Sequence, residues 1–295
     1  MKKTYLLAFT AIFFWSTVAV TSKLLLENHK NVQVLWISVL LACLSLFVYN
    51  LATGKLKKFR EYKAKDYIIS SLIGLPGTFL YYMFYYAGTE RMPASQAFIV
   101  NYLWPIMSVV FACIIMKEKM TVRKAVAIFV SFLGVAIVTG GELISFDANV
   151  AVGALCCALG AVSYGLFTAL NQKFNYETSL SMMMSYFLTF VITTVINASN
   201  NELFIPLPAE FLGFVWNGVF TMAVANTLWV IALSTGNTAK ISNLAYITPF
   251  ASLIWTTVIL DEPLNVYFII GLIIIVMGIF IQLKDKQKSK IKEQG

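Results

Sequence analysis

Long apolar runs, joined by short polar connections, fill almost the whole of this 295-residue chain. A bilayer core of ~30 Å is crossed by about 20 apolar residues in a helix, so each run predicts one membrane-spanning helix. We count ten runs, at approximately 4–26, 32–52, 67–88, 93–116, 122–140, 151–172, 179–198, 210–234, 239–260 and 265–283. The connections are too short to contain a soluble domain. The pattern therefore predicts an all-α integral membrane protein with ten transmembrane helices.

The second half of the chain repeats the first at a constant offset. Residues 105–134 align without gaps on residues 249–278, and the same offset pairs Pro105 with Pro249, Glu118 with Glu262, Gly134 with Gly278 and Tyr102 with Tyr246. Ten helices thus become five plus five, and because five is odd, the two halves cross the membrane in opposite directions. We expect two inverted five-helix repeats, residues 1–145 and 146–295, with a binding site near the midplane where they meet.

The charge distribution predicts which side of the membrane holds the termini. Charged residues make up 12% of the chain and hydrophobic residues 59%, whereas a soluble domain has about 25% charged residues. Nineteen of the 22 Lys and Arg residues fall on the side of the N-terminus, and only Lys23, Lys30 and Arg91 fall on the other. Both termini are therefore expected in the cytoplasm, in a multi-pass protein of the plasma membrane. The net charge of +8 follows from this topology and from attraction to anionic lipid, and it requires no nucleic acid partner.

The apolar runs lack the residues that an enzyme or a metal site would need. His29 is the only histidine and lies in a loop, and the 14 acidic residues fall in loops, tails or the ends of the runs. No glycine-rich phosphate loop is present. The four cysteines show no metal-ligand spacing and are expected to be packing residues: Cys43, Cys113, Cys156 and Cys157. We expect no catalytic residue, metal or cofactor.

Polar and aromatic side chains stand instead at mid-depth in the runs. Asn101 and Trp104 are three residues apart and so share a helix face, which requires protein or water against it. Rings with polar tips suit a flat, partly apolar solute, or a planar or quaternary cation held over ring faces. The candidate substrate-binding residues are Trp15, Tyr82, Tyr85, Asn101, Tyr102, Trp104, Tyr164, Asn226, Trp229 and Tyr246. Core packing is the alternative for each, and an interfacial belt is a further alternative for the tyrosines of 81–86.

Three prolines within the runs are expected to act as hinges, because proline withdraws a backbone donor and bends its helix: Pro76, Pro105 and Pro249. Lys23 lies in the outer half of the first run, where it either extends to the membrane surface or contacts substrate. The central turns of the runs contain no Asp, Glu or His. We therefore expect transport without obligatory proton coupling, and Lys23 is the one residue that could carry a proton.

Several motifs resemble the drug/metabolite transporter superfamily in its ten-helix EamA-type branch. They are FFWSTVAVTSK in the first run and the paired proline-to-glutamate segments that end in KEK and LDEPL. Within that branch, IVNYLWP at 99–105 and LWVIALSTGN at 228–237 resemble the YddG-type aromatic amino acid exporters. The helix that reads FLYYMFYY and the Val230 that follows Trp229 depart from the pattern of those exporters.

The resemblance implies a basket of two inverted halves around a central cavity, which exports aromatic and other neutral amino acids. It adds Tyr81 to the candidate residues and repeats Trp15, Asn101, Tyr102, Trp104, Trp229 and Tyr246. Efflux of planar or quaternary cationic drug-like compounds is the first alternative. A non-transporting membrane scaffold is a more remote one, since a scaffold needs neither a polar midplane nor an inverted duplication. The oligomeric state stays open, and a monomer is compatible with the pattern.

Overall fold

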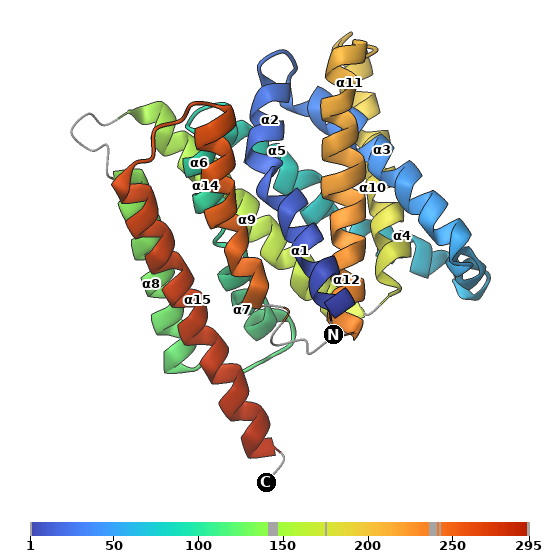
Figure 1. The fold of residues 1–295 in the computed structure, drawn as a ribbon. Coiled ribbons are helices and arrows are strands. Elements are labelled where there is room, and N and C mark those ends of the chain that lie inside the picture. Colours follow the sequence, from blue (N-terminus) through green and yellow to red (C-terminus); the bar gives the residue numbers. More distant parts are fainter. Residues whose placement is uncertain (1, 141–146, 175, 236–240, 242, 294–295) are drawn as a thin grey trace.

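The computed structural model of this chain is a bundle of helices, with no strand among the residues that it describes, 2–140, 147–174, 176–235, 241 and 243–293 (Figure 1). Inside a bilayer every backbone amide and carbonyl needs an internal partner, and a helix supplies it. The expected boundary between the repeats at 145/146 and the first residues of the run 239–260 lie outside these ranges.

Eight helical stretches in the described ranges are long and apolar enough to cross a membrane: Lys2–Leu26, Asn31–Ala52, Ala64–Thr89, Ala94–Ile115, Val122–Thr139, Ala148–Phe174, Thr178–Ser199 and Pro208–Thr235. Two shorter apolar helices, Ala245–Ile259 and Val266–Ile281, fall within the last two expected runs. Each stretch overlaps one of the apolar runs. By length and composition, the chain is a multi-pass membrane protein.

The stretches of the first half divide into shorter elements. In chain order they are α1 (Lys2–Ser16), α2 (Val18–Leu26), α3 (Asn31–Ala52), the 3-10 helix η1 (Lys55–Glu61), α4 (Ala64–Leu72), the π-helical turn η2 (Pro76–Leu80), α5 (Tyr81–Thr89), α6 (Ala94–Asn101), α7 (Trp104–Ile115) and α8 (Val122–Gly140).

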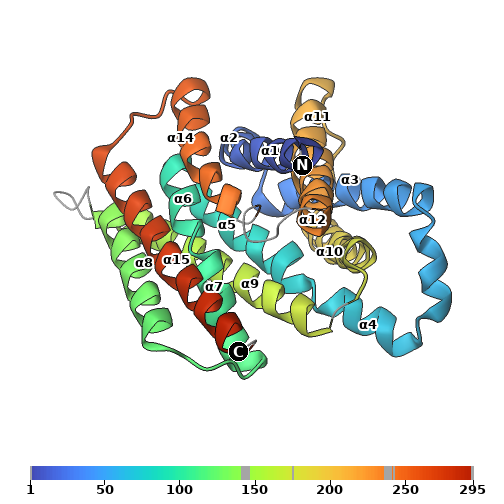
Figure 2. The same ribbon diagram turned by 60° about the horizontal axis from the view of Figure 1, so that its bottom comes forward.

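The second half divides in a similar way. Its elements are α9 (Ala148–Phe174), α10 (Thr178–Ser199), α11 (Pro208–Val215), the π-helical segment η3 (Trp216–Val224), α12 (Ala225–Thr235), the 3-10 turn η4 (Ala245–Ile247), α14 (Thr248–Ile259) and α15 (Val266–Glu293). The beginning of α1 and the end of α15 lie at the same end of the bundle, which we call the termini end (Figures 1 and 2). The opposite end is called the far end.

Two spans are interrupted at equivalent positions of the repeat. One break separates α6 from α7 at Tyr102 and Leu103, and the other is η4, directly before α14. Pro105 and Pro249 lie in the first turns of α7 and α14. Because proline has no amide hydrogen, the carbonyl four residues earlier loses its helical partner, so each helix stops short of its proline. Pro76 likewise begins the π-helical turn η2.

Close helix contacts also recur at equivalent glycines. A Cβ on Gly74 would lie 1.8 Å from the Ser185 Oγ of α10, and a Cβ on Gly218 would lie 2.3 Å from the Ser38 carbonyl oxygen of α3. Real Cβ atoms do not approach this closely, so only glycine fits at either place. Small residues are common where membrane helices pack backbone against backbone.

Helices α8 and α15 lie side by side at one edge of the bundle (Figures 1 and 2). A Cβ on Gly134 of α8 would meet the Gly271 carbonyl oxygen at 2.7 Å, and a Cβ on Gly278 of α15 would meet the Ala127 carbonyl oxygen at 2.7 Å. Early residues of one helix thus face late residues of the other. These two helices, which correspond in the repeat, are antiparallel.

The helix contacts of the two halves come in matched pairs. Helix α9 packs against α5 and α7, and its counterpart α1 packs against α12 and α14, the counterparts of α5 and α7. Helix α3 packs against its own counterpart α10, as α8 does against α15. The central space lies between the two sets, and the helices that surround it bring the candidate residues of both halves together.

Candidate functional site

A central cavity of about 300 Å³ lies between the two halves of the bundle. Nine of the eleven candidate residues from the sequence line it: Trp15, Tyr81, Tyr82, Asn101, Tyr102, Trp104, Tyr164, Asn226 and Trp229. They come from α1, α5, α6, α7, α9 and α12 and from the break between α6 and α7. The volume is at the lower end of the usual range for sites that bind small organic molecules.

Aromatic rings form two walls of this cavity. On one side Tyr164 of α9 packs against Tyr81 and Trp104, with ring centroids 4.9 and 5.1 Å apart. On the other side Trp15 of α1 lies against Trp229 of α12 at 5.2 Å. The tilted and edge-to-face arrangements are those that aromatic pairs prefer. The walls therefore offer ring faces and ring edges to a solute between them.

Two buried polar atoms of the cavity lining have no hydrogen-bond partner within the described residues, Asn101 Oδ1 and Thr248 Oγ1. The Asn101 Nδ2 donates a hydrogen bond to the Tyr81 hydroxyl at 2.9 Å, while its Oδ1 is buried and has no partner in the described structure. Buried amide oxygens normally accept a hydrogen bond. By contrast, the Asn226 amide donates to the Met222 carbonyl of its own helix at 2.6 Å. A donor on a bound molecule that reached the Asn101 Oδ1 would satisfy it.

Among the described residues that line the cavity, none has a charged side chain. Hydroxyl and amide groups are present, and many bond to their own helix, as Thr168 Oγ1 does to the Tyr164 carbonyl at 2.9 Å. Burial of an isolated charge without a counter-charge is costly, so this lining favours solutes of zero net charge. An ammonium group could still approach the Asn101 Oδ1 and the faces of the rings.

Two candidates from the sequence lie outside the lining. Tyr85 is fully buried, with its ring 6.0 Å from that of Tyr81. Tyr246 packs against Phe280 of α15 at 5.2 Å. Both residues are neighbours in sequence of residues that line the cavity. Their side chains, however, pack into helix contacts and do not line the cavity.

The cavity also contains residues that the sequence reasoning missed. Phe167, Thr168 and Asn171 follow Tyr164 at helical spacing on α9, and Met182 and Tyr186 come from α10. The spacing of three, four and seven residues from Tyr164 was a usable signal. The two α10 residues carried none, because a methionine and a tyrosine four apart in an apolar run equally indicate core packing.

The cavity extends toward the termini end and closes toward the far end. Its lining reaches Asn171, in the last turn of α9, and the exposed Thr178, the first residue of α10. In the other direction it stops at Val18 and Phe98. Beyond these residues the chain is tightly packed, and Thr89 is completely buried.

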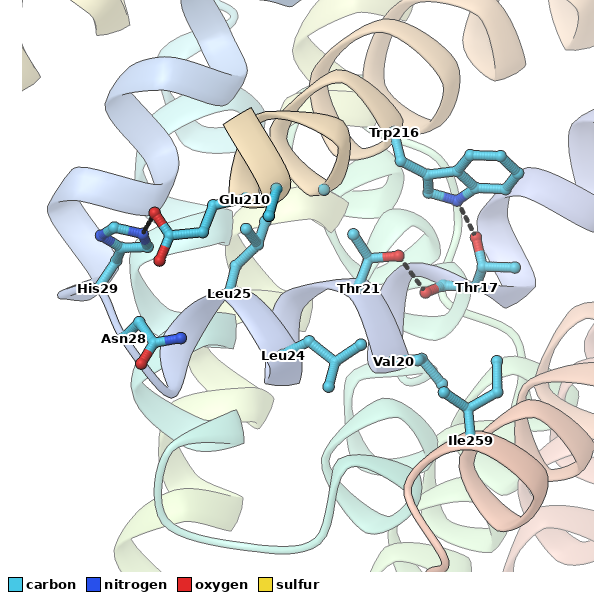
Figure 3. Close-up of a pocket in the computed structure, with 12 residues that line it drawn as sticks. Thr17, Val20, Thr21, Leu24, Leu25, Asn28, His29, Glu210, Trp216 and Ile259 are labelled. Atoms are coloured by element: carbon cyan, nitrogen blue, oxygen red, sulfur yellow. Dashed lines mark hydrogen bonds and ion pairs between the residues drawn. The ribbon is translucent and has the colours of Figure 1, made fainter. Parts of the chain in front are cut away.

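A second pocket, of about 420 Å³, lies between α2, α11 and η3 toward the far end (Figure 3). Its wall is mostly apolar, and at each of its two ends a pair of polar side chains is in contact. Trp216 Nε1 donates to Thr17 Oγ1 at 2.8 Å, and His29 Nε2 lies 3.3 Å from a Glu210 carboxylate oxygen. This pocket offers no counterpart to the ring walls or to the unpartnered Asn101 Oδ1. We therefore take the central cavity as the candidate site.

Lys23 does not reach the cavity. Its Nζ donates to the carbonyl oxygens of Thr89 and Met92, at 2.7 and 3.2 Å. The lysine thus lies outside the cavity in this structure. Its ammonium group binds a backbone turn within the protein.

The fold and the sequence both have known relatives. A solved crystal structure covers 96% of this chain, and this chain covers 96% of that one, with a TM-score of 0.65 at 21% identity. The uncharacterized transporter YvbV of Bacillus subtilis is 25% identical over 76% of this chain and 73% of its own length. The aromatic amino acid exporter YddG of Ancylobacter novellus is 21% identical over 84% of this chain and 85% of its own length.

The sequence model of the EamA-like transporter family matches residues 2–140 and, a second time, residues 151–283. The two matched segments together contain most of the chain, including every residue of the central cavity. This protein therefore belongs to the EamA-like transporter family.

Proposed function

We propose that this protein is a secondary transporter that exports small neutral or zwitterionic metabolites, with aromatic and other neutral amino acids as its substrates. The observation that carries the proposal is the central cavity, which combines aromatic walls, an uncharged lining and the unused Asn101 Oδ1. An aromatic amino acid matches it in shape, net charge and donor groups. The similarity to a protein named as an aromatic amino acid exporter adds support.

In this proposal the cavity residues bind the substrate and the proline breaks are the hinges. The ammonium group of the substrate donates to Asn101 Oδ1, and its ring packs between the wall of Trp104 and Tyr164 and the wall of Trp15 and Trp229. The amino acid carboxylate is held by hydroxyls and by backbone groups freed at the breaks near Pro105 and Pro249, since helix ends carry partial charges. Pro76 is the corresponding hinge before helix α5. Tyr85 and Tyr246 support the cavity from behind in this conformation.

The proposed topology has ten spans in two inverted halves, residues 1–145 and 146–295, with both termini in the cytoplasm. The matched helix contacts and the antiparallel pair α8 and α15 support the inversion. The basic loops support the orientation. The protein then lies in the plasma membrane, and the cavity opens toward the cytoplasm, from which an exporter loads its substrate.

Transport in this proposal is exchange down a gradient without obligatory proton coupling. A coupled carrier needs a site that takes up the proton or ion and biases the two states, and within hydrocarbon this is usually an acidic residue or a histidine. The described residues of the cavity lining include neither. Uptake into proteoliposomes under an imposed pH gradient, without a substrate gradient, tests this step. Concentrative accumulation would reject it.

Efflux of planar or quaternary cations is the second candidate, because the Trp15 and Trp229 pair presents ring faces within the cavity. It is the weaker candidate since no carboxylate lines the cavity. A panel of amino acids and organic cations, tested by uptake into proteoliposomes, distinguishes the two.

A further inference from the structure

The turn between α5 and α6, residues 89–95, is gripped by two side chains of opposite charge. On one side Lys23 Nζ of α2 donates to the Thr89 and Met92 carbonyl oxygens. On the other side the Glu262 carboxylate accepts from the Ala94 and Ser95 amides, at 2.6 and 2.9 Å. A cation thus meets the free carbonyls where α5 ends, and an anion meets the free amides where α6 begins. Both match the polarity of the helix ends.

The two gripping residues come from distant parts of the chain. Lys23 lies in the first helical stretch and Glu262 in the connection between α14 and α15. Neither is needed to form the turn itself, because Arg91 N already donates to the Gly88 carbonyl at 3.0 Å and Ala97 N to the Pro93 carbonyl at 2.9 Å. The two contacts therefore hold the turn to its neighbours, and they join helices that the turn does not contain.

The gripped turn closes the far end of the bundle. Thr89 and Ala94 are fully buried, and Ser95 is 3% exposed. The central cavity ends below this turn, at Phe98. A substrate that leaves the cavity by the far end has to pass between the elements that Lys23 and Glu262 hold together.

Where the turn joins α6, and in the neighbouring helix α14, two hydroxyl groups are buried without a hydrogen-bond partner in the closed structure. Ser95 Oγ of α6 and Ser252 Oγ of α14 are buried, and within the described ranges neither has a hydrogen-bond partner. Buried hydroxyls are nearly always bonded, so such groups need a reason. Their presence is explained if the contact between α6 and α14 opens to water in another conformation.

We propose that Lys23 and Glu262 are a two-sided latch on the 89–95 turn, and that its release opens an exit between α6 and α14. The inference rests on the proposed transport function, since a latch has a purpose only if the far end opens. Each side of the latch is a charge-assisted contact with two backbone groups. Replacing either charge by a neutral side chain shifts the population toward the state that is open at the far end.

The test measures labelling of reporter cysteines in the full-length protein in nanodiscs, where both ends are accessible to reagent. The four native cysteines are replaced, and Ser252→Cys reports on the far end while Thr168→Cys reports on the cavity. With a polar maleimide, Glu262→Gln and Lys23→Met are expected to raise the labelling rate at 252 by about tenfold, the effect of losing one charge-assisted hydrogen bond. The same variants are expected to lower the rate at 168, because the termini end closes as the far end opens.

Matched controls use two other contacts of the same end, His29 with Glu210 and Lys30 with Glu202. Glu210→Gln and Lys30→Gln remove charges that do not touch the turn, and they should leave both rates unchanged. Unchanged labelling at 252 in the latch variants would overturn the proposal. A rise at both reporters would also overturn it, because that pattern means a loosened bundle. Cysteine labelling does not require the substrate. If the protein failed to transport amino acids, the proposed function would be rejected, and the labelling rates would still test the latch.

Discussion

The Tyr102 hydroxyl donates a hydrogen bond to the Ala245 carbonyl oxygen, across the centre of the bundle. That carbonyl would bond to the amide of residue 249 in a regular helix, but residue 249 is a proline and has no amide hydrogen. A side chain beside the break of one half thus satisfies the backbone at the break of the other half. The two proline breaks are joined, and Tyr102 lines the cavity at the junction.

Tyr102→Phe is expected to destabilise the protein by about 0.5–1.5 kcal/mol, since the Ala245 carbonyl loses the Tyr102 hydroxyl and keeps only the Thr248 amide as a donor. The measurement is the thermal unfolding midpoint of the purified protein in detergent. Tyr246→Phe is the control, because that ring packs on Phe280 and the variant keeps the packing. Equal midpoints for the wild type and Tyr102→Phe would show that the bond contributes nothing.

Gly218→Ala is expected to cost about 1–3 kcal/mol through overpacking. The added Cβ would lie 2.3 Å from the Ser38 backbone carbonyl oxygen, which cannot move without shifting α3. Gly213→Ala is the matched control, as its Cβ would meet only the end of the flexible Leu25 side chain at 3.0 Å. Comparing the two unfolding midpoints tests the close contact of η3 with α3. A similar midpoint for both variants would contradict it.

The ion pairs of Glu177 with Lys55 and Lys58 lead us to expect that the protein loses stability in acid. Partial burial of Glu177 works against ionisation, but hydrogen bonds and charges from Lys55 and Lys58 outweigh this and hold the pKa of the carboxyl below its usual value. Because the pKa is lower in the folded state, the stabilisation is present above the unfolded-state value of about 4.3 and is lost as the pH falls through the folded-state pKa. The thermal unfolding midpoint of the wild type should therefore decrease as the pH is lowered through this range. The midpoint of Glu177→Gln should decrease less over the same range. Parallel curves would disprove the assignment.

The topology predicts which residues are accessible from outside the cell. In a background without native cysteines, Asn149→Cys and Asn201→Cys should react with a membrane-impermeant maleimide on intact cells, and Thr53→Cys should not. All three positions are exposed, so the difference reports only the side of the membrane. Labelling at position 53 in intact cells would reverse the proposed orientation.

The repeat in the sequence predicted the breaks of the fold well. The offset that pairs Pro105 with Pro249 also relates the first and last residues of α7 to those of α14. A proline acts on its own helix, so its effect can be inferred from position alone. The prediction placed a hinge at each proline, but it did not identify the Tyr102 hydroxyl as a donor to the Ala245 carbonyl, because that side chain comes from the other half.

The tyrosines at 81–86 show why the site was less predictable. A regular helix places Tyr81 on the face of Tyr85 and Tyr82 on the face of Tyr86. The rings of Tyr81 and Tyr85 are stacked on one face, 6.0 Å apart, but Tyr85 lies one turn nearer the closed far end, against Phe98. Tyr81 and Tyr82 line the space, while Tyr85 is buried. Periodicity could not have told these residues apart.

Counterflow of labelled phenylalanine in proteoliposomes tests the central claim, that the uncharged cavity around Asn101 carries neutral amino acids. The wild type is expected to exchange phenylalanine and to be inhibited by excess tryptophan more than by an organic cation. Asn101→Ala should weaken substrate affinity by up to about a hundredfold, because the substrate loses its acceptor. Tyr85→Phe should exchange like the wild type, since Tyr85 lies outside the cavity. Absence of phenylalanine exchange in the wild type, or wild-type affinity in Asn101→Ala, would contradict the account.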